Sequence, residues 1–413
     1  MRIAIVGAGI SGIAAAHRLQ DSAEVTVFEA RRRIGGHTDT HSILVEGRTY
    51  SVDSGFIVFN EQNYPEFSAW LTELGVASQP SDMSFGVCNE RSGLEYGSRG
   101  VDGLFSQRRN LFSPRFLRML SDLRRFYADA AALKASDDRT LLEFVESQRY
   151  GAGFLEDHLA PMCSALWSLP LNSVLDIPIY HVVAFMAHHR MLQLNGRPEW
   201  RVVRGGSSSY LDAFTRRFSG TIATGDEVLR VERRPGGAIV TTRSGRARFD
   251  AVVLACHSDQ ALSLLHDPSV EEREVLGAIP YQRNRVVVHS DDSVMPASRP
   301  AWSSWNARVN EKDTLGCQVT YWMNLLQSLS SEHQFFVTLN PTRQLRDVWS
   351  EREYAHPVFT LEARKAQARR AQISGSRNTF FCGAYWGWGF HEDGFASGTA
   401  VAAEIMQEAV RAA

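Results

Sequence analysis

Three glycines and one acid near the start of the chain have the spacing of a loop that binds phosphate groups. The loop lies between an apolar run and a helical run, and its residues are Gly7, Gly9, Ile10, Ser11 and Gly12. In a G-x-G-x-x-G loop the glycines permit a tight turn, close approach of a pyrophosphate and close packing of helix on strand. Glu29 ends the next apolar run, at the offset of an acid that binds ribose hydroxyl groups. The pattern predicts a dinucleotide site at the N-terminus of the first helix.

A second glycine pair follows the acid and narrows the choice of cofactor. Glu29 and Ala30 are followed by three arginines and then by Gly35 and Gly36. This arrangement resembles the E-A-x(n)-G-G motif of the flavoprotein superfamily of amine oxidases, protoporphyrinogen oxidases and phytoene desaturases. The resemblance implies FAD and adds these residues to its site: Ala30, Arg31, Gly35, Gly36, His37 and Thr38. His37 stands where an arginine often follows, and alternatively it is only a loop residue.

Later segments complete the flavin site that the resemblance implies. They contribute Val228 in a predicted hairpin, Ala255 after a buried strand, and Gly383, Gly394 and Phe395 near the C-terminus. A helix predicted over 395–410 would place its N-terminus beside the flavin ring and stabilise negative charge there. Ala384 replaces the aspartate that usually binds the ribityl chain, and Glu392 or Asp393 either takes over this role or caps the helix.

Candidate residues for substrate chemistry lie close to this C-terminal segment. We assign an aromatic wall beside the flavin to Tyr385, Trp386 and Trp388, which could equally pack the C-terminal helix. We seek a proton acceptor among His391, Glu392 and His188, unless the flavin itself moves the proton. The spacing of cysteines and histidines is not that of a metal site, so we expect no metal.

The positions of these motifs predict an α/β fold in which the cofactor domain is assembled from distant parts of the chain. With 413 residues, the chain exceeds the size at which one core keeps growing. We expect a Rossmann-like FAD-binding domain of the glutathione-reductase-2-like type, interleaved with a mixed α+β substrate domain. The predicted FAD-binding domain comprises 1–65, 200–260 and 370–413, and the substrate domain comprises 66–199 and 261–369, with a helical part at about 107–195.

Two segments of the predicted substrate domain are candidates for contact with lipid. Residues 107–127 combine six arginines with apolar residues at helical spacing, which predicts a basic amphipathic helix that docks on an anionic membrane. Alternatively, the arginines form an ordinary solvated face. The apolar segment 159–194 would suit a slot for a hydrocarbon chain, or it is a buried helical core.

Composition and charge exclude several classes of protein. A net charge of −2 with 44% hydrophobic and 22% charged residues is typical of a globular chain without a general attraction for nucleic acid. The five cysteines are scattered, and the sequence contains neither a signal-peptide pattern nor an apolar run of about 20 residues that would span a membrane. We therefore expect a cytoplasmic protein that binds peripherally at the inner face of the plasma membrane.

Four motifs together resemble a bacterial family of FAD-dependent oxidoreductases related to the flavoprotein domain fused to plant cyclopropane fatty acid synthases. The motifs are DSGFIVFNEQNYP at 53–65, WRVVRGGS at 200–207, HSDQAL at 257–262 and GWGFHEDG at 387–394. The resemblance implies desaturation of a fatty acyl chain, methyl-branched, unsaturated and carried by a membrane phospholipid, as in furan fatty acid biosynthesis. A hydride would pass to flavin N5 and a proton to a base, and O2 or an electron carrier would reoxidise the flavin.

Two other functions remain open from the sequence. The first is a flavin amine oxidase acting on a small amine or polyamine. Many amine oxidases place a lysine near the flavin, and of Lys134, Lys312 and Lys365 only Lys312 lies in a strand-rich part of the predicted substrate domain. The second is a non-catalytic, FAD-bound, lipid-binding protein.

Overall fold

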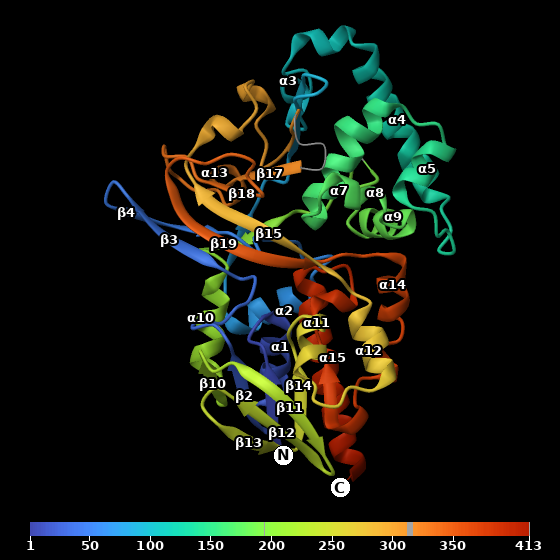
Figure 1. The fold of residues 1–413 in the computed structure, drawn as a ribbon. Coiled ribbons are helices and arrows are strands. Elements are labelled where there is room, and N and C mark those ends of the chain that lie inside the picture. Colours follow the sequence, from blue (N-terminus) through green and yellow to red (C-terminus); the bar gives the residue numbers. More distant parts are fainter. Residues whose placement is uncertain (194, 312–316, 413) are drawn as a thin grey trace.

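The chain folds into an elongated molecule of two lobes. The computed structural model describes residues 1–193, 195–311 and 317–412. In Figure 1 the lower lobe contains both chain termini, and the upper lobe contains a large sheet beside a group of helices. Within these described residues, no helix is both long and apolar enough to span a membrane.

The lower lobe is built around a five-stranded parallel sheet with the strand order β10-β2-β1-β14-β20. Its central strand is a buried apolar run, and it pairs in parallel with a strand on each side: Ile3 lies opposite both Val25 and Ala251. Such runs are typical of strands whose two faces are both covered. The strands are β1 Arg2–Val6, β2 Glu24–Glu29, β10 Thr221–Thr224, β14 Ala251–Leu254 and β20 Thr379–Phe381. This confirms the predicted α/β fold.

Helices and a second small sheet cover the two faces of the parallel sheet. The antiparallel sheet β11-β12-β13, predicted as a hairpin, packs on one face, and α1 and α15 pack together on the other. The sheet strands are β11 Val228–Arg234, β12 Gly237–Thr242 and β13 Arg246–Phe249. The helices of this lobe are α1 Ile10–Leu19, α2 Pro65–Leu74, α10 Ser208–Arg217, α11 Ser258–Leu264, α12 Val270–Gly277, α14 Leu361–Gln367 and α15 His391–Ala412.

The upper lobe contains a seven-stranded mixed sheet with the order β19-β15-β18-β17-β16-β7-β8. Its two longest strands, β15 and β19, lie along the boundary between the lobes (Figure 1). The strands are β7 Phe85–Asn89, β8 Leu94–Gly97, β15 Tyr281–His289, β16 Trp305–Val309, β17 Cys317–Trp322, β18 Phe336–Leu339 and β19 Val348–Pro357.

A helical group with its own apolar core packs beside this sheet. Its helices are α3 Gly100–Leu104, α4 Pro114–Ala131, α5 Leu141–Ser147, α6 Ala152–Phe154, α7 Ala160–Trp167, α8 Leu171–Leu175 and α9 Ile179–His188. The short helix α13, Met323–Leu326, follows β17. Two small sheets join the lobes and consist of β3 Thr40–Val45, β4 Arg48–Asp53, β5 Val58–Phe59, β6 Ser78–Pro80 and β9 Arg201–Val203.

Two predicted helix starts differ from the structure. The C-terminal helix α15 begins at His391 rather than at 395, because the acids of 392–393 are accommodated in its first turn. The basic segment 107–127 is not one helix: residues Arg108–Phe112 form a 3₁₀ turn, and α4 begins at Pro114, with Ser113 accepting a hydrogen bond from the amide of Phe116. A serine N-cap followed by proline is a strong start signal.

The predicted domain boundaries also differ from the packing. Helix α2 was expected in the substrate domain, but its Phe67 and Trp70 are buried in the lower lobe against Tyr210 and Phe395. Helices α11, α12 and α14 likewise pack on the lower sheet. Conversely, the hairpin β3-β4 packs its Ile43 and Val52 on the upper sheet.

Candidate functional site

The loop between β1 and α1 has the close packing that its glycines predict. Gly7 has a φ of +108°, and a Cβ at Gly12 would lie 2.0 Å from the carbonyl oxygen of Gly7. Gly9 differs, because no atom lies within 4 Å of the position a Cβ would take there. Gly9 is also the N-cap of α1, and no side chain caps this helix end. The first turn of α1 therefore faces an open space and offers its amides to an anion.

Glu29 and the second glycine pair hold this loop from the other side. The Glu29 carboxylate accepts hydrogen bonds from the amides of Ala8 and Arg31, both at 2.9 Å. Each of its oxygens can still accept a further hydrogen bond. The Gly35 amide donates to the carbonyl of Ala8 at 2.7 Å. At Gly36, where φ is +60°, a Cβ would lie 3.1 Å from Gly9 Cα. The two glycine motifs thus meet at Gly9. Ala30 and Arg31 are exposed.

The C-terminal segment meets the same loop. A Cβ at Gly394 would lie 2.8 Å from the side chain of Ile10, so only glycine permits this approach of α15 to α1. The Gly383 amide donates to the Ser397 hydroxyl at 3.1 Å. Ala255 lies next to Gly7, since a Cβ at Gly7 would be 2.8 Å from the Ala255 carbonyl oxygen. The structure therefore brings these predicted residues together from both ends of the chain.

Four other predicted cofactor residues lie in packed interiors. The side chain of Phe395 is fully buried in the lower core, so only its backbone could reach a cofactor. Ser11 and Val228 are buried, Val228 at the start of β11. The Thr38 hydroxyl is hydrogen-bonded to that of Tyr210.

A cluster of histidine and tyrosine rings, which the sequence did not predict as a group, surrounds His37. The ring centroid of His37 lies 5.0 Å from Tyr354, 5.2 Å from His356 and 6.2 Å from His257. The His257 ring in turn stacks on Tyr281 at 4.5 Å. We call these five residues the histidine cluster. It joins the loop after Gly36, the end of β14 and the strands β15 and β19.

The partly buried histidines His37 and His356 of the cluster are neutral near neutral pH. Burial, together with the nearby imidazole of His356, lowers the pKa of His37 well below its usual value. Burial lowers the pKa of His356 to about 4. The Nε2 atom of His37 is buried and has no hydrogen-bond partner among the described residues. An unpartnered buried nitrogen is costly, so this atom is suited to contact a bound ligand.

Two of the three predicted proton acceptors have structural roles instead. His391 is buried in the lower lobe, where its ring stacks on Phe56 at 3.6 Å and its Nε2 is hydrogen-bonded to the Tyr210 hydroxyl at 2.9 Å. Burial lowers the pKa of His391 to about 3. The Glu392 carboxylate accepts the amides of Glu66 and Phe67 at 2.9 and 3.0 Å, so it caps α2 rather than α15. These contacts argue against His391 and Glu392 as bases.

The third candidate, His188, lies beside one member of the predicted aromatic wall and away from the other two. His188 is exposed at the end of α9, and its ring lies 4.9 Å from Trp388. Phe390 stacks on Phe185 of the same helix at 4.7 Å. Tyr385 is instead buried on the lower lobe, with Trp386 beside it at 4.8 Å. The surface that meets the upper lobe is therefore formed by Trp388, a member of the predicted aromatic wall, and by Phe390, whereas Tyr385 and Trp386 lie outside it.

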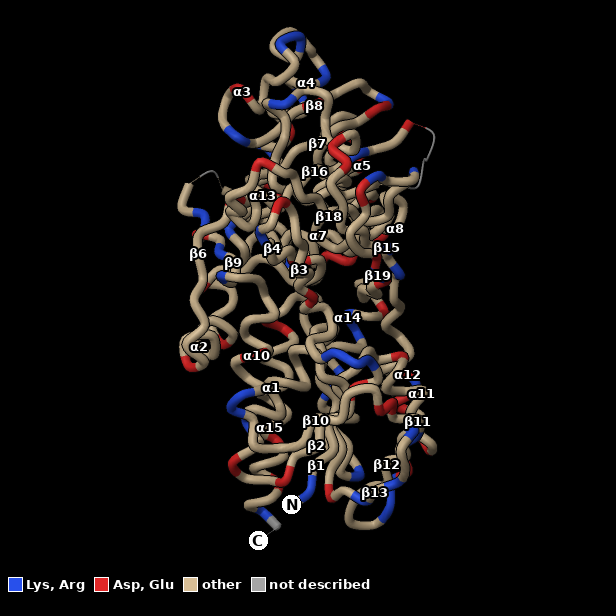
Figure 2. Tube along the Cα trace, turned by 90° about the vertical axis from the view of Figure 1, so that its left-hand side faces the viewer, with Lys and Arg blue, Asp and Glu red and all other residues tan. Residues whose placement is uncertain are grey.

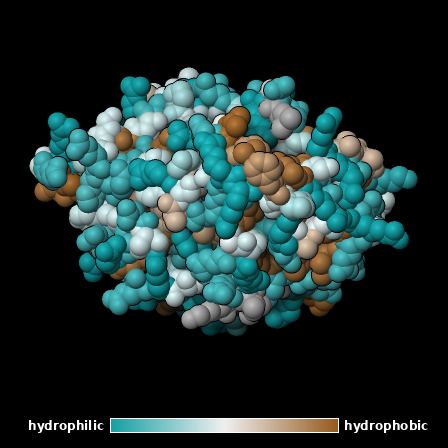
Figure 3. Space-filling model, turned by 90° about the horizontal axis from the view of Figure 1, so that it is seen from above, coloured by the Kyte–Doolittle hydropathy of each residue, from teal (hydrophilic) through white to brown (hydrophobic). Residues whose placement is uncertain are grey.

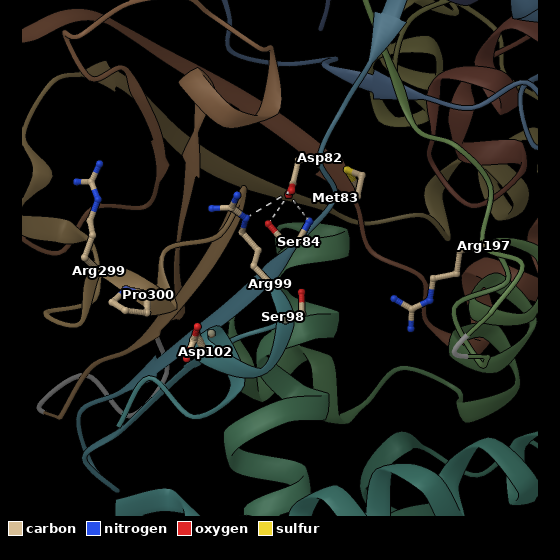
Figure 4. Close-up of a pocket in the computed structure, with 11 residues that line it drawn as sticks. Asp82, Met83, Ser84, Ser98, Arg99, Asp102, Arg197, Arg299 and Pro300 are labelled. Atoms are coloured by element: carbon tan, nitrogen blue, oxygen red, sulfur yellow. Dashed lines mark hydrogen bonds and ion pairs between the residues drawn. The ribbon is translucent and has the colours of Figure 1, made fainter. Parts of the chain in front are cut away.

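An open polar pocket of about 670 Å³ lies elsewhere, in the upper lobe (Figure 4). Three arginines and two acids line it: Arg99, Arg197, Arg299, Asp82 and Asp102. Arg99 forms an ion pair of 3.6 Å with Asp82. The pocket contains none of the predicted site residues, so it is separate from the loop at Gly9.

Comparison with known proteins identifies the family. The family profile described as flavin containing amine oxidoreductase matches residues 10–297. The chain belongs to this family. A protein of Mycobacterium tuberculosis named as a flavin-containing monoamine oxidase, AofH, is 24% identical over 276 residues, which are 64% of this chain and 59% of that protein. The chain thus spans about three-fifths of the length of this curated relative.

Solved structures share the fold over nearly the whole chain. A structure described as a protoporphyrinogen oxidase from Exiguobacterium has a TM-score of 0.73 at 16% identity and covers 98% of this chain and 99% of its own. The fatty acid isomerase of P. acnes that produces CLA has a TM-score of 0.67 at 15% identity and covers 98% of both chains. At these identities the likeness shows the fold alone.

The family's cofactor is FAD, and the residues of this chain fit it. The open space at Gly9 and the uncapped first turn of α1 suit a diphosphate, and Glu29 has capacity for ribose hydroxyl groups. The unpartnered Nε2 of His37 lies just beyond the second glycine pair. These residues, with the backbone at Gly383 and Gly394, would hold the cofactor.

Proposed function

We propose that this flavin-dependent oxidoreductase dehydrogenates a fatty acyl chain, methyl-branched and unsaturated and carried by a phospholipid. The four sequence motifs support this substrate through their resemblance to acyl-chain desaturases. The fold shared with a fatty acid isomerase is compatible with it. We choose an acyl chain over an amine because the carboxylates around the site already accept hydrogen bonds from the protein chain.

Besides Glu29, four buried or half-buried carboxylates belong to the segments that build the site. They are Asp39, Asp53, Glu392 and Asp393. Asp39 accepts hydrogen bonds from Arg352 and Tyr354, and Asp53 accepts them from Ser207 and Gln327. Glu392 accepts the amides of α2, and Asp393 accepts the amide of Phe390. These hydrogen bonds leave fewer acceptor positions on the carboxylates for a substrate ammonium. An apolar substrate needs no such positions.

The aromatic surface between the lobes would serve to hold such a chain. Trp388 and Phe390 face Phe185 across the boundary, and Phe185 belongs to the apolar core of the helical group. A hydrocarbon lying there would be shielded from water and oriented with one allylic carbon toward the cofactor. When bound, FAD supplies the acceptor for the hydride that leaves this carbon.

The second hydrogen leaves the substrate as a proton, for which the histidine cluster offers acceptors. His37 and His356 are neutral because desolvation lowers their pKa values, and a neutral imidazole can accept a proton. His37 has the unpartnered nitrogen, whereas Nδ1 of His356 is hydrogen-bonded to Asn284 at 2.8 Å. We therefore assign the proton to the cluster rather than to His391 or Glu392.

Anaerobic titration of the purified holoprotein tests this proposal. We expect an unsaturated, methyl-branched phospholipid to bleach the visible absorbance of the flavin, and the product to contain one additional double bond per flavin reduced. A saturated phospholipid of equal length is the control and should leave the flavin oxidised. Bleaching by none of the acyl lipids would reject the proposal.

An amine oxidase is the second candidate, because the relative AofH carries that name. Lys134 and Lys365 are both exposed, and Lys312 lies outside the described residues. The same titration with putrescine and spermidine distinguishes the two activities. Bleaching by these amines but not by acyl lipids would replace our proposal. If neither class bleaches the flavin although lipid binds, the protein is a lipid-binding flavoprotein.

A further inference from the structure

We propose that residues 101–118, which form the far end of the upper lobe, dock on the surface of an anionic lipid bilayer. We call this segment the tip. It comprises most of α3, the 3₁₀ turn Arg108–Phe112 and the first turn of α4. In Figure 1 it is the part of the molecule most distant from the two termini.

The tip exposes large apolar side chains that nothing in the described chain covers. Twelve large hydrophobic residues are exposed among the described residues, and four lie in this one segment: Val101, Leu111, Phe112 and Leu117. Phe112 is 84% exposed and Val101 is 71% exposed. Figure 3, which looks down on this end, shows apolar side chains gathered beside hydrophilic ones. Large apolar groups that cluster on a surface mark a site of interaction.

The local structure explains why these side chains point outward. Ser113 and Pro114 start α4, and this helix then turns Phe116 and Met119 into the apolar core, where each is 1% exposed. Leu117 lies on the opposite face of the same turn and is 46% exposed. Phe112 precedes the N-cap and is directed away from the core. The tip therefore presents a second apolar surface.

The charge around the tip is complementary to an anionic membrane. Residues 101–127 contain six arginines and two aspartates, a net charge of +4 in a chain whose total is −2. Figure 2 shows the basic residues at this end of the molecule. Arg109 and Arg124 are exposed and form no ion pair with any described residue. Arg109 donates one hydrogen bond to the carbonyl of Gly93, and its other N–H groups can meet phosphate groups of lipids, as can those of Arg124.

The polar pocket of Figure 4 adjoins the tip and adds to this charge. Helix α3 lines the pocket with Gly103 while it exposes Val101. The guanidinium of Arg299 is held over the ring of Trp302 at 3.6 Å, and no described carboxylate pairs with it. A bilayer against the tip would thus bring headgroup phosphates close to Arg99 and Arg299. Exposed apolar groups beside arginines are the composition of a segment that inserts shallowly between lipids.

Sedimentation with vesicles tests the docking without requiring turnover, so its result is independent of the proposed substrate. The holoprotein should bind vesicles of phosphatidylcholine mixed with phosphatidylglycerol, and should bind pure phosphatidylcholine vesicles at least tenfold more weakly. Raising the salt concentration should release it, because exposed charges are screened. Equal binding to both vesicles, or no binding to either, would overturn the proposal. If the tip instead mediates self-association, the protein will dimerise and leave the vesicles unbound.

Matched variants locate the binding surface. Phe112→Asp should reduce binding to the anionic vesicles at least tenfold, whereas Val270→Asp, at a site that is 66% exposed in the lower lobe, should leave it unchanged. Arg109→Gln and Arg124→Gln should each reduce binding about fivefold, the factor expected for one arginine near such a surface. Arg48→Gln, an exposed arginine of β4, is the charge control. All variants should keep the flavin absorbance and melting temperature of the parent, and equal loss in a variant and its control would contradict the assignment.

Discussion

Gly9 and Gly12 belong to the same loop, but a side chain would meet different surroundings at each. No atom lies within 4 Å of a Cβ at Gly9, whose φ of −75° suits any residue. We predict that Gly9→Ala folds normally but binds FAD at least tenfold more weakly, about 1.4 kcal/mol, because the methyl group fills the space of the diphosphate. Flavin content and fluorescence titration with FAD measure this loss.

Gly12→Ala is the matched control within the loop. Its Cβ would lie 2.0 Å from the carbonyl of Gly7, so the loop or α1 must shift, at a cost of about 1–3 kcal/mol or more in the free energy of unfolding. We expect a lower melting temperature of the flavin-free protein for Gly12→Ala but not for Gly9→Ala. A Gly9→Ala protein with full flavin content would show that the diphosphate does not pass there.

His181 is a buried histidine whose titration should destabilise the protein in acid. It stacks on Phe359 at 4.7 Å, and burial lowers its pKa to about 3. The unfolded chain binds this proton below a pKa of about 6.5, so stability falls as the pH drops below about 6.5 and is constant above it. In urea unfolding, the free energy of unfolding of His181→Phe should therefore fall by about 2 kcal/mol less than that of the parent between pH 6.5 and pH 4.5.

A variant that removes packing but keeps the imidazole separates the two effects. Phe359→Leu should lower the free energy of unfolding by a similar amount at both pH values, because His181 still titrates. Parallel pH profiles for His181→Phe and the parent would contradict the prediction.

The residues of the site divide into those that a local pattern could predict and those that it could not. Gly7, Gly9, Gly12 and Glu29 belong to one short motif whose spacing is imposed by the ligand, so the sequence predicted them. The histidine cluster has no such spacing, because its members come from four separate segments. His356 lies near His37 because β19 packs on the loop after Gly36, where Arg352 and Tyr354 are hydrogen-bonded to Asp39. A histidine directly after the second glycine pair was the one local signal.

At the scale of elements, α2 depends on a residue more than three hundred positions away. Its N-cap residue, Tyr64, makes no side-chain capping bond, and Glu392 supplies both acceptors instead. We predict that Glu392→Ala lowers the free energy of unfolding by about 1–2 kcal/mol. Glu392→Gln, which keeps one acceptor oxygen, should lose less, and its rate of flavin reduction should stay close to that of the parent. A large loss of rate with unchanged stability in Glu392→Gln would restore this residue as a catalytic base.

Helix starts were predictable where the capping signal is local. Ser113 and Pro114 are such a signal for α4, although the arginines and apolar residues before them also predicted a helix. For α15 the acids at 392–393 were weighed as caps of their own helix. Asp393 does cap its own helix, since its carboxylate accepts the amide of Phe390 directly before α15. Glu392 instead accepts two amides of α2, and no sequence pattern connects α2 with α15.

At the scale of the whole molecule, the interleaving of two lobes was predictable because motifs for one cofactor occur at both ends of the chain. The boundaries were not, since they depend on which core each helix joins. Helix α2 follows the predicted end of the first cofactor segment and yet packs between α10 and α15. Its aromatic residues suit either core, and only the tertiary contacts distinguish the two.

Asp39 ties the lobes together and allows a test of their coupling. It is 6% exposed and lies in the loop after His37, but its carboxylate accepts hydrogen bonds from Arg352 and Tyr354 of β19 at 2.7 and 3.0 Å. Burial would raise the pKa of Asp39, but the hydrogen bond from Arg352 and the charge of Arg33 outweigh it and lower the pKa. The carboxylate is therefore ionised and depends on its partners.

We predict that Arg352→Ala lowers the free energy of unfolding by about 1–3 kcal/mol, because Asp39 remains buried with fewer donors. Arg285→Ala is the control. Arg285 of β15 pairs with Glu351 of β19 at 2.7 Å, but both side chains are about half exposed, and such pairs contribute little to stability. Since β19 also carries His356 and Tyr354, the Arg352 variant should release FAD at a lower temperature than the parent, in step with its unfolding. If flavin release and unfolding occur at different temperatures, or if Arg352→Ala and Arg285→Ala lower stability equally, Asp39 does not couple the two lobes.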